Sequence, residues 1–193
     1  MICRKSDTES VYIAADYLKR GKIVVLPTDT VYGFSGIVDG RHYSYHTDQK
    51  IRELKGRSEE KPFIQLLAKP DDLKKYTRDL VPASVLEKWP GALTVIVHTF
   101  LKGGERTTTA FRCPGDEWLR KVIALCGAPV YSTSLNRSGE PVLDNVQDIK
   151  KAFGGEVSLI IDDGSKRGSL PSTIVRIEED GGLTVVRRGS VLI

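Results

Sequence analysis

The sequence predicts an α/β protein built around one mixed β-sheet. Short β-rich runs alternate with helical segments along most of the 193 residues, as in layered α/β folds. Near the end, two strand-like runs follow one another across Asp180-Gly181-Gly182, which predicts a hairpin and therefore an antiparallel pair. A chain of this length has room for one sizeable core, so we expect a single domain spanning residues 1–193.

Six helices are expected. The first should begin at a capping box made by Ser6 and Glu9, keep helical spacing through Leu18 and stop at Gly21. Proline near a first helical turn predicts two short helices. The other five expected helices are 47–55, ended by Gly56, then 70–76, 82–89, 116–126, and a last one capped by Asn145 and running to Phe153.

Apolar and β-branched runs predict the strands. The clearest is LTVIVHTF, residues 93–100, which follows the breaker Pro90-Gly91. The full expected set is 22–26, 63–68, 93–100, 107–113, 129–134, 157–161, 171–177 and 183–187. Polar loops rich in Thr, Ser, Lys and Arg follow several of these strands. Because ligands of open α/β sheets bind beyond the strand ends, these loops are the first candidates for a site.

Composition excludes several classes of protein. No stretch approaches the roughly 20 apolar residues of a membrane-spanning helix, and residues 1–10 lack an apolar signal core, so we expect a cytoplasmic protein without membrane association. Three scattered cysteines form neither a disulfide framework nor a zinc site. Neither GxxxxGK[ST] nor GxGxxG is present, and the candidate loops contain no histidine for Ser-His or Cys-His catalysis. The net charge of +4 suits anionic ligands such as nucleotides, and equally suits weak RNA contact.

Two of the candidate loops suit a polyphosphate. Lys55-Gly56-Arg57, with Lys61 nearby, offers point charges and a planar fork, although cations at a helix end also complement the helix dipole. Residues 132–139 (STSLNRSG) crowd hydroxyls and an amide at a strand end, where they could bind phosphate oxygens or simply form a turn.

Three further segments suit a small polar ligand. Arg112 at the end of a Thr-rich strand is a candidate carboxylate clamp or a surface ion pair. Thr28 and Thr30 place hydroxyls in the loop 27–33, which could also be a plain tight turn. Pro171-Ser172-Thr173 enters the predicted hairpin, and Arg187 lies at its far end.

Taken together and in this order, the segments resemble the YrdC-like family, the L-threonylcarbamoyladenylate synthases. The matching segments are PTDTVYG (27–33), KGR with KPF (55–63), WPGALTVIV (89–97), TTAFR (108–112), STSLNRSG (132–139), PSTIV (171–175) and RRGS (187–190). The family joins L-threonine, bicarbonate and ATP into threonylcarbamoyl-AMP and pyrophosphate, for the t6A modification of tRNA. The resemblance implies a twisted mixed (parallel/antiparallel) sheet flanked by helices, the YrdC-like α/β twist, with a positively lined cavity.

The resemblance also implies roles for individual residues. The residues implied to be catalytic are Lys55, Arg57, Ser134 and Asn136. Those implied to bind ATP are Lys55, Arg57, Lys61, Thr108, Ser134, Asn136, Val142 and Arg187. Those implied to bind L-threonine are Thr30, Arg112, Ser132 and Ser172, with Arg112 on the carboxylate. Mg²⁺ is expected on the ATP phosphates, with no metal site made by the protein alone, and the product is expected to pass to a tRNA threonylcarbamoyl-transferase complex.

The sequence departs from the family pattern at a few positions. Leu135 stands where Ala is usual, so a larger side chain is expected to border the nucleotide, and Lys61 replaces a common Asn. Three alternatives remain open at this point. They are an RNA-binding module for tRNA or double-stranded RNA without turnover, a carbamoyl-transfer domain of a hydrogenase-maturation protein, and an inactive member of the family. The absence of an RNP-type aromatic motif speaks against the first.

Overall fold

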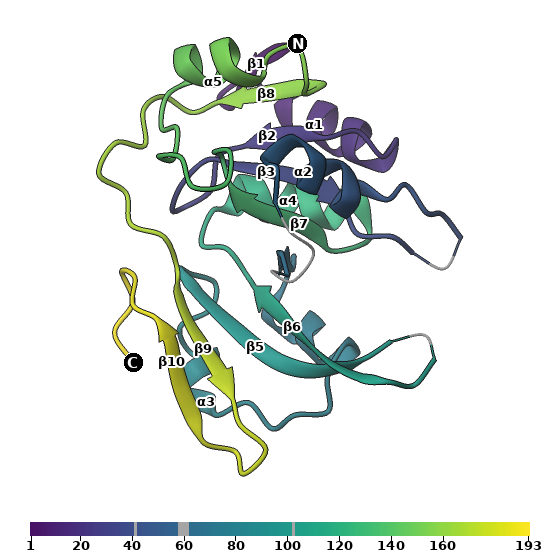
Figure 1. The fold of residues 1–193 in the computed structure, drawn as a ribbon, viewed down its shortest axis with the longest axis vertical. Helices are drawn as coiled ribbons and strands as arrows, with labels where there is room; N and C mark the ends of the chain where they lie inside the picture. The colour runs from purple at the N-terminus through teal and green to yellow at the C-terminus, as the bar shows by residue number, and fades with distance from the viewer. Residues whose placement is uncertain (41, 58–61, 102) are drawn as a thin grey trace.

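Ten strands form one sheet in the computed structural model, which describes residues 1–40, 42–57, 62–101 and 103–193 (Figure 1). The strands lie in the order β1-β8-β2-β3-β7-β4-β6-β5-β9-β10. Their bounds are β1 Ile2–Arg4, β2 Val24–Leu26, β3 Gly33–Ile37, β4 Ile64–Leu66, β5 Leu93–Phe100, β6 Arg106–Arg112, β7 Val130–Ser134, β8 Leu159–Asp162, β9 Thr173–Ile177 and β10 Leu183–Arg187. Four neighbouring pairs are parallel and five are antiparallel, which confirms the predicted mixed sheet.

The helices cover the sheet mainly around β1, β8, β2, β3 and β7 (Figure 1). Their bounds are α1 Ser10–Lys19, α2 Thr47–Lys55, the 3₁₀ helix η1 Pro70–Lys75, α3 Ala83–Leu86, α4 Glu117–Cys126 and α5 Val146–Phe153. Gly56 ends α2 with a positive φ of 58°, as glycine readily does. The Asn145 side chain accepts a hydrogen bond from Asp148 N and so caps α5, which confirms that prediction. None of the helices in the described ranges is long and apolar enough to cross a membrane.

The predicted capping box of Ser6 and Glu9 is wrong. Helix α1 begins at Ser10, and Glu9 at its N-cap makes no side-chain capping bond. Asp7 takes over locally, because its carboxylate accepts from Arg4 N at 3.1 Å and its carbonyl oxygen accepts from Ser10 N at 2.9 Å. The chain therefore enters α1 from a turn that follows β1.

Strands β1 and β3 were missed by the sequence prediction. In β3 the sequence GFSGI contains two glycines, which normally weaken a strand. A Cβ at Gly33 would lie 3.0 Å from Ser132 Oγ, and one at Gly36 would lie 2.7 Å from Thr47 Cβ. The glycines thus allow β7 and α2 to pack closely against β3, and they help to bring the ends of β3 and β7 together.

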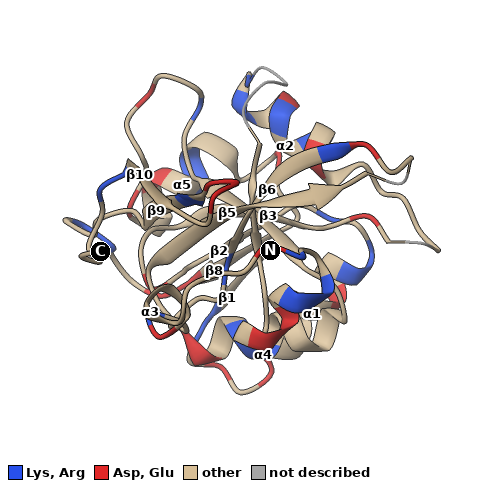
Figure 2. Cartoon of the chain, turned by 90° about the horizontal axis from the view of Figure 1, so that it is seen from below, with Lys and Arg blue, Asp and Glu red and all other residues tan. Residues whose placement is uncertain are grey.

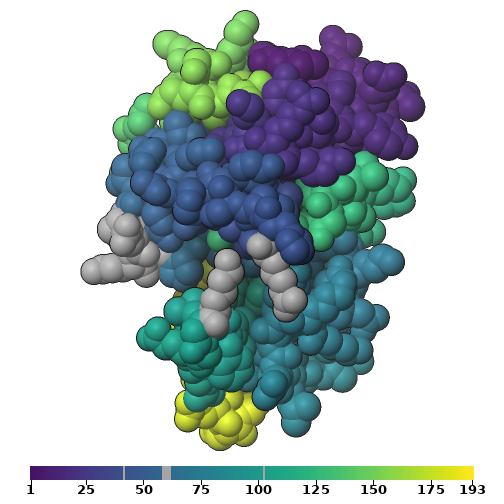
Figure 3. Space-filling model, turned by 90° about the vertical axis from the view of Figure 1, so that its right-hand side faces the viewer, coloured from purple at the N-terminus to yellow at the C-terminus, as the bar shows by residue number. Residues whose placement is uncertain are grey.

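Three buried clusters stabilise the sheet. The first lies under α1 and α4 and includes Leu18, Leu26 and Leu119. The second lies under α2 and α5 and includes Phe34, Ile51 and Phe153, with Phe34 and Phe153 edge to face at 4.8 Å. The third surrounds β5 and β9 and includes Trp89, Val95 and Phe111. Figure 3 shows the N-terminal residues at one end of the long axis and the C-terminal hairpin at the other.

Candidate functional site

A first pocket of about 180 Å³ forms where the ends of β3, β6, β7, β9 and β10 converge. All four residues predicted to hold threonine line it, namely Thr30, Arg112, Ser132 and Ser172. They come from four separate stretches of the chain. The structure therefore brings together a set that the sequence could only group by resemblance.

A second pocket of about 430 Å³ adjoins the first. It is lined by Lys55, Gly56, Arg57, Ser134, Asn136, Ser138 and Gly139. Arg57 and Ser134 line both pockets, so these two residues form the junction between them. All four residues predicted to be catalytic thus line one pocket that adjoins the first.

Lys55 is only 3% exposed and holds the Ser134–Asn136 segment in place. Its ammonium donates to Ser134 O at 2.5 Å, to Asn136 O at 2.7 Å and to Asn136 Oδ1 at 3.0 Å. An ammonium has three N–H bonds, so all three are engaged by the loop. Burial, and secondarily the neighbouring Arg57, lowers the pKa of Lys55 to about 8.

Asn136 and Ser134 complete the same cluster. Ser134 Oγ donates to Asn136 Oδ1 at 2.8 Å, and Asn136 Nδ2 donates to the carbonyl oxygens of Arg137 and Glu140. The side-chain amide of Asn136 therefore accepts from Lys55 and Ser134 and donates to two carbonyl oxygens of its own loop. Lys55, Ser134 and Asn136 shape the wall of the second pocket through bonds to one another.

Arg57 has a different environment. Its Nη1 donates to Thr133 Oγ1 at 3.1 Å and its Nη2 to Pro62 O at 3.3 Å, while its guanidinium lies 5.0 Å from the Phe63 ring centroid. Within the described part of the chain, its buried Nε finds no acceptor. Burial, followed by Arg52, lowers the pKa of Arg57. The second N–H of Nη1 and that of Nη2 have no acceptor among the described residues, so a guanidinium at the junction of two pockets can offer them to an incoming anion.

Arg112 forms a buried ion pair with Asp29 rather than a surface one. Its side chain is 5% exposed and donates through Nε to Gly91 O at 3.0 Å, through Nη1 to Thr30 Oγ1 at 2.9 Å, and through Nη2 to Asp29 Oδ1 at 2.5 Å. A guanidinium carries five N–H bonds, and no described residue accepts the other two. Arg112 is therefore fixed on three sides.

The hydroxyls of Thr28 and Thr30 are ordered by the same contacts. Thr28 Oγ1 donates its single proton to Val31 O at 2.8 Å, so in the 2.9 Å contact between the two hydroxyls Thr30 is the donor. Thr30 Oγ1 also accepts from Arg112. One lone pair of Thr30 remains for a ligand donor such as an amine.

Arg187 lies in the first pocket and holds Ser172. Its Nε and Nη2 donate to Ser172 O at 3.1 and 2.8 Å, and its Nη2 also donates to Ser172 Oγ at 3.1 Å. Ser172 Oγ is also 2.8 Å from Thr94 Oγ1. Burial, and then Arg112, lowers the pKa of Arg187, which reflects two guanidinium groups facing one space. The resemblance places Arg187 with the ATP residues, whereas its contacts here are to a residue of the predicted threonine-binding set.

Some predicted residues lie away from the pockets. Among the described residues that line them, Thr108 and Val142 do not appear; Thr108 is exposed on β6, and Val142 is 44% exposed. Thr108 is four residues before Arg112, roughly 13 Å along the strand. Lys61 lies outside the described residues. Leu135 is fully buried with Phe34 in the second core cluster and is not among the described residues that line either pocket, so its place beside the nucleotide stays a prediction.

Sequence reasoning missed Asp29 and Thr94. Asp29 lies between the two threonines of the loop 27–33, so an acid flanked by hydroxyls beside a buried strand was a signal that could have been used. Thr94 lies within an apolar strand, where a hydroxyl partner for Ser172 could not be recognised without the pairing of β5 with β9.

Comparison with known proteins bears on this site. A profile of the Sua5, YciO and YrdC proteins, described as "Telomere recombination", matches residues 16–189. The threonylcarbamoyl-AMP synthase of Pyrococcus abyssi is 32% identical over 178 residues, 88% of this chain and 51% of that protein. The threonylcarbamoyl-AMP synthase of Chromohalobacter salexigens is 32% identical over 166 residues, 81% of this chain and 86% of that protein.

The solved structure of P. abyssi Sua5 complexed with L-threonine superposes with a TM-score of 0.83 and 28% identity, over 98% of this chain and 57% of that one. This chain therefore spans about half of the P. abyssi protein but most of the C. salexigens protein. The profile match covers far more than half of the chain, and the relatives agree with it. The chain belongs to the Sua5/YciO/YrdC family.

Proposed function

We propose that this protein is an L-threonylcarbamoyladenylate synthase, a nucleotidyltransferase that joins L-threonine, bicarbonate and ATP into threonylcarbamoyl-AMP and pyrophosphate. The observation that carries the proposal is the pair of pockets that meet at Arg57 and Ser134. One has the chemistry to hold an amino acid, and the other has cations and hydroxyls for phosphates. Relatives named threonylcarbamoyl-AMP synthase support the assignment.

In the first pocket, the two remaining N–H bonds of Arg112 suit the carboxylate of threonine. Thr30, Ser132 and Ser172 provide hydroxyls for the amine and the side-chain hydroxyl. The similar P. abyssi Sua5 structure is a complex with L-threonine, and we carry that ligand over to this pocket.

In the second pocket, we propose that the ATP phosphates lie against Arg57, Ser134 and Asn136, with Lys55 shaping the loop and adding positive charge. Mg²⁺ would enter with the nucleotide, since it is usually held through substrate phosphates, and the hydroxyls of Ser134 and Ser138 are suitable oxygen ligands. By resemblance, Lys61, Thr108, Val142 and Arg187 also belong to the ATP-binding set.

The reaction fits this arrangement. The amine of threonine combines with bicarbonate to form a carbamate, with loss of water. A carbamate oxygen then attacks the α-phosphorus, and pyrophosphate leaves. The attacking and leaving groups lie in adjoining pockets, so negative charge develops beside Arg57. The protein's contribution is to orient the two substrates and stabilise this charge.

The wider setting is part of the same proposal. Threonine, bicarbonate and ATP are cytoplasmic metabolites, which supports a cytoplasmic location. The adenylate is reactive, so we propose handover to a tRNA threonylcarbamoyl-transferase complex for t6A synthesis, with weak tRNA contact through the net positive charge.

The test is pyrophosphate release by the pure protein with ATP, bicarbonate and threonine. Release should depend on threonine, and Arg57→Ala should lower it about a hundredfold, which corresponds to roughly 3 kcal/mol of lost stabilisation. Arg106→Ala is the matched control, because Arg106 makes an exposed ion pair with Glu179. Full activity in Arg57→Ala would contradict the assignment, and salt-sensitive RNA binding without turnover would favour the RNA-binding alternative.

A further inference from the structure

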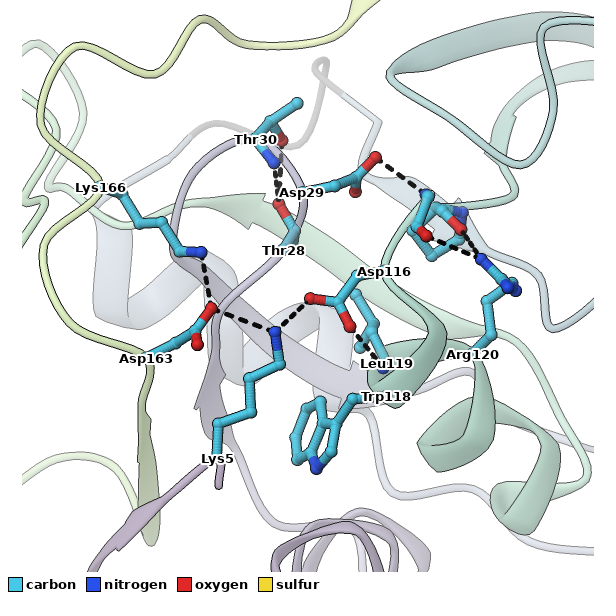
Figure 4. A network of polar contacts seen from close by, with 12 residues as sticks. Lys5, Thr28, Asp29, Thr30, Asp116, Trp118, Leu119, Arg120, Asp163 and Lys166 are labelled. Atoms are coloured by element: carbon cyan, nitrogen blue, oxygen red, sulfur yellow. Dashed lines mark hydrogen bonds and ion pairs between the residues drawn. The ribbon is translucent and has the colours of Figure 1, made fainter. Parts of the chain in front are cut away.

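Asp29 connects the loop 27–33 to the segment before α4. Its carboxylate accepts from Arg112 Nη2 at 2.5 Å and from Gly115 N at 2.8 Å, and its side chain is 21% exposed. Figure 4 shows this carboxylate reaching toward the segment that precedes α4, while Thr28 and Thr30 bond to each other. Asp29 is not among the described residues that line the first pocket, although both of its neighbours are.

The segment around Gly115 is itself fixed. Asp116 caps α4 by accepting from Leu119 N at 3.0 Å, and it also accepts from Lys5 Nζ at 2.5 Å. Arg120 Nη1 donates to the carbonyl oxygens of Pro114 and Gly115 at 2.9 Å (Figure 4). The N–H of Gly115 is thus a stationary donor, and it determines where the Asp29 carboxylate lies.

Lys5 extends this support to the loop after β8. Its ammonium also donates to Asp163 Oδ2 at 3.1 Å, and Lys166 donates to the same oxygen at 2.6 Å (Figure 4). The chain continues from there to Ser172 in the first pocket. One charged network therefore connects the segment before α4 with the loop after β8.

Resting on the proposed function, we propose that Asp29 is a positioning residue for the amino-acid substrate. It holds the Arg112 guanidinium so that its two remaining N–H bonds face the threonine carboxylate. Gly91 O and Thr30 Oγ1 fix the other edges, but both are neutral acceptors. The charged Asp29 contact is the strong one of the three.

The chemistry requires an aspartate at this position. Both partners of Asp29 are N–H donors, and a carboxylate offers an acceptor oxygen to each. An asparagine of the same shape offers one acceptor and an NH₂ group, which would face another donor. Glycine at position 115 is required as well, because a Cβ there would lie 2.9 Å from Asp29 Oδ2.

The experiment compares L-threonine with L-threoninol, in which a neutral hydroxymethyl group replaces the carboxylate. In Asp29→Asn, the KM for threonine should rise at least tenfold, while the KM for ATP changes less than about twofold. The Ki of threoninol as a competitive inhibitor should change much less, because threoninol has no carboxylate to pair with Arg112. Asp29→Glu keeps both acceptors and should recover part of the loss, and Gly115→Ala should shift the threonine KM in the same direction.

Asp79→Asn is the matched control. The Asp79 carboxylate also accepts from a backbone N–H and a side-chain group, those of His98 at 2.7 and 3.0 Å, away from both pockets. Asp79→Asn should lower the free energy of unfolding without changing the ratio of the threonine KM to the threoninol Ki. If Asp29→Asn weakened the binding of threonine and threoninol equally, the role of Asp29 would be merely structural. If it lowered the threonine KM, Asp29 would serve only to offset the charge of Arg112. Either result overturns the proposal.

The result also separates this inference from the proposed function. A wild type with threonine-dependent turnover and an unchanged threonine KM in Asp29→Asn would refute the positioning role alone. If turnover is absent, the dissociation constants of threonine and threoninol, measured by calorimetry, take the place of KM and Ki in the comparison. A wild type that neither turns over nor binds threonine would refute both.

Discussion

Lys55 and Arg57 stand two positions apart at the end of α2 but meet different surroundings. The Lys55 ammonium is engaged by three oxygen atoms of the Ser134–Asn136 loop. Arg57 lies at the junction of the two pockets, and the described residues accept only two of its five N–H bonds. A sequence pattern shows only two cations near a glycine. It cannot separate the cation that shapes a loop from the one that lies at the junction of two pockets, because that depends on which oxygen atoms the fold brings within reach.

The lowered pKa of Lys55 gives a pH dependence of stability. The pKa is about 8 in the folded state against an ordinary 10.5, so between these values the unfolded state binds more protons. Stability contributed by this group therefore rises with pH in that window. Lys55→Met has no titrating group at this position. Between about pH 8 and pH 10.5, we therefore expect the free energy of unfolding of the wild type to rise by about 1 to 3 kcal/mol relative to that of Lys55→Met.

Urea unfolding at several pH values measures the gap, which is the difference in the free energy of unfolding between the wild type and Lys55→Met. Lys50→Met removes an exposed lysine from the same helix and controls for general effects of the substitution. A gap that narrows with rising pH would mean that burial does not disfavour the charged form of Lys55.

At the scale of elements, strand β10 shows how one extra residue can direct a side chain. Its pairing with β9 runs Val185 opposite Val175 and then Arg187 opposite Ile174, so Val186 is a bulge. Ile174 lines the first pocket, and side chains of paired residues share a face. The bulge therefore places Arg187 on the pocket side of the sheet, where it bonds Ser172.

Deletion of Val186 should be tolerated. It removes the bulge but leaves Arg187 opposite Ile174, and β10 is exposed along its length, so little packing is lost. We expect threonine-dependent pyrophosphate release within about threefold of the wild type. Insertion of one alanine after Val186 should instead turn Arg187 to the opposite face and lower the rate at least tenfold. Equal effects of deletion and insertion would contradict this register.

The elements differ in how well the sequence predicts them. Helix α2 and the hairpin of β9 and β10 are confirmed, because periodicity, Gly56 and a turn sequence are local signals. Strand β3 was missed because its glycines are required by neighbours distant in the sequence. Resemblance named the pocket residues, but not the partners that hold them, such as Asp29 and Thr94, since these contacts depend on strand order.

Across the whole molecule, four cations gather at two adjoining pockets of a mildly basic protein. Lys55, Arg57, Arg112 and Arg187 line the joined pockets, whereas acidic and basic residues are mixed over the helices (Figure 2). Such a concentration of one charge attracts polyanions over several ångströms and is screened by salt.

Salt should therefore affect the KM for ATP more than the KM for threonine. Between about 50 mM and about 500 mM KCl, the KM for ATP should rise several-fold, because screening weakens long-range attraction to the triphosphate. Threonine has no net charge at neutral pH, so its KM should change less than about twofold. Steady-state pyrophosphate assays at each salt concentration measure both constants. A parallel rise in both would point to a general effect of salt on the fold.

The strand order also determines when the site can come into existence during synthesis. Strand β1 can pair only after β8 is made, more than 150 residues later, and Ser172 gains the bonds from Arg187 only once residue 187 is made. At ribosomal rates of 5 to 20 residues per second, about 10 to 40 s separate the start of the chain from residue 187. No nascent fragment that ends before Arg187 contains all the residues that line the first pocket. A prematurely ended chain is therefore not expected to consume ATP.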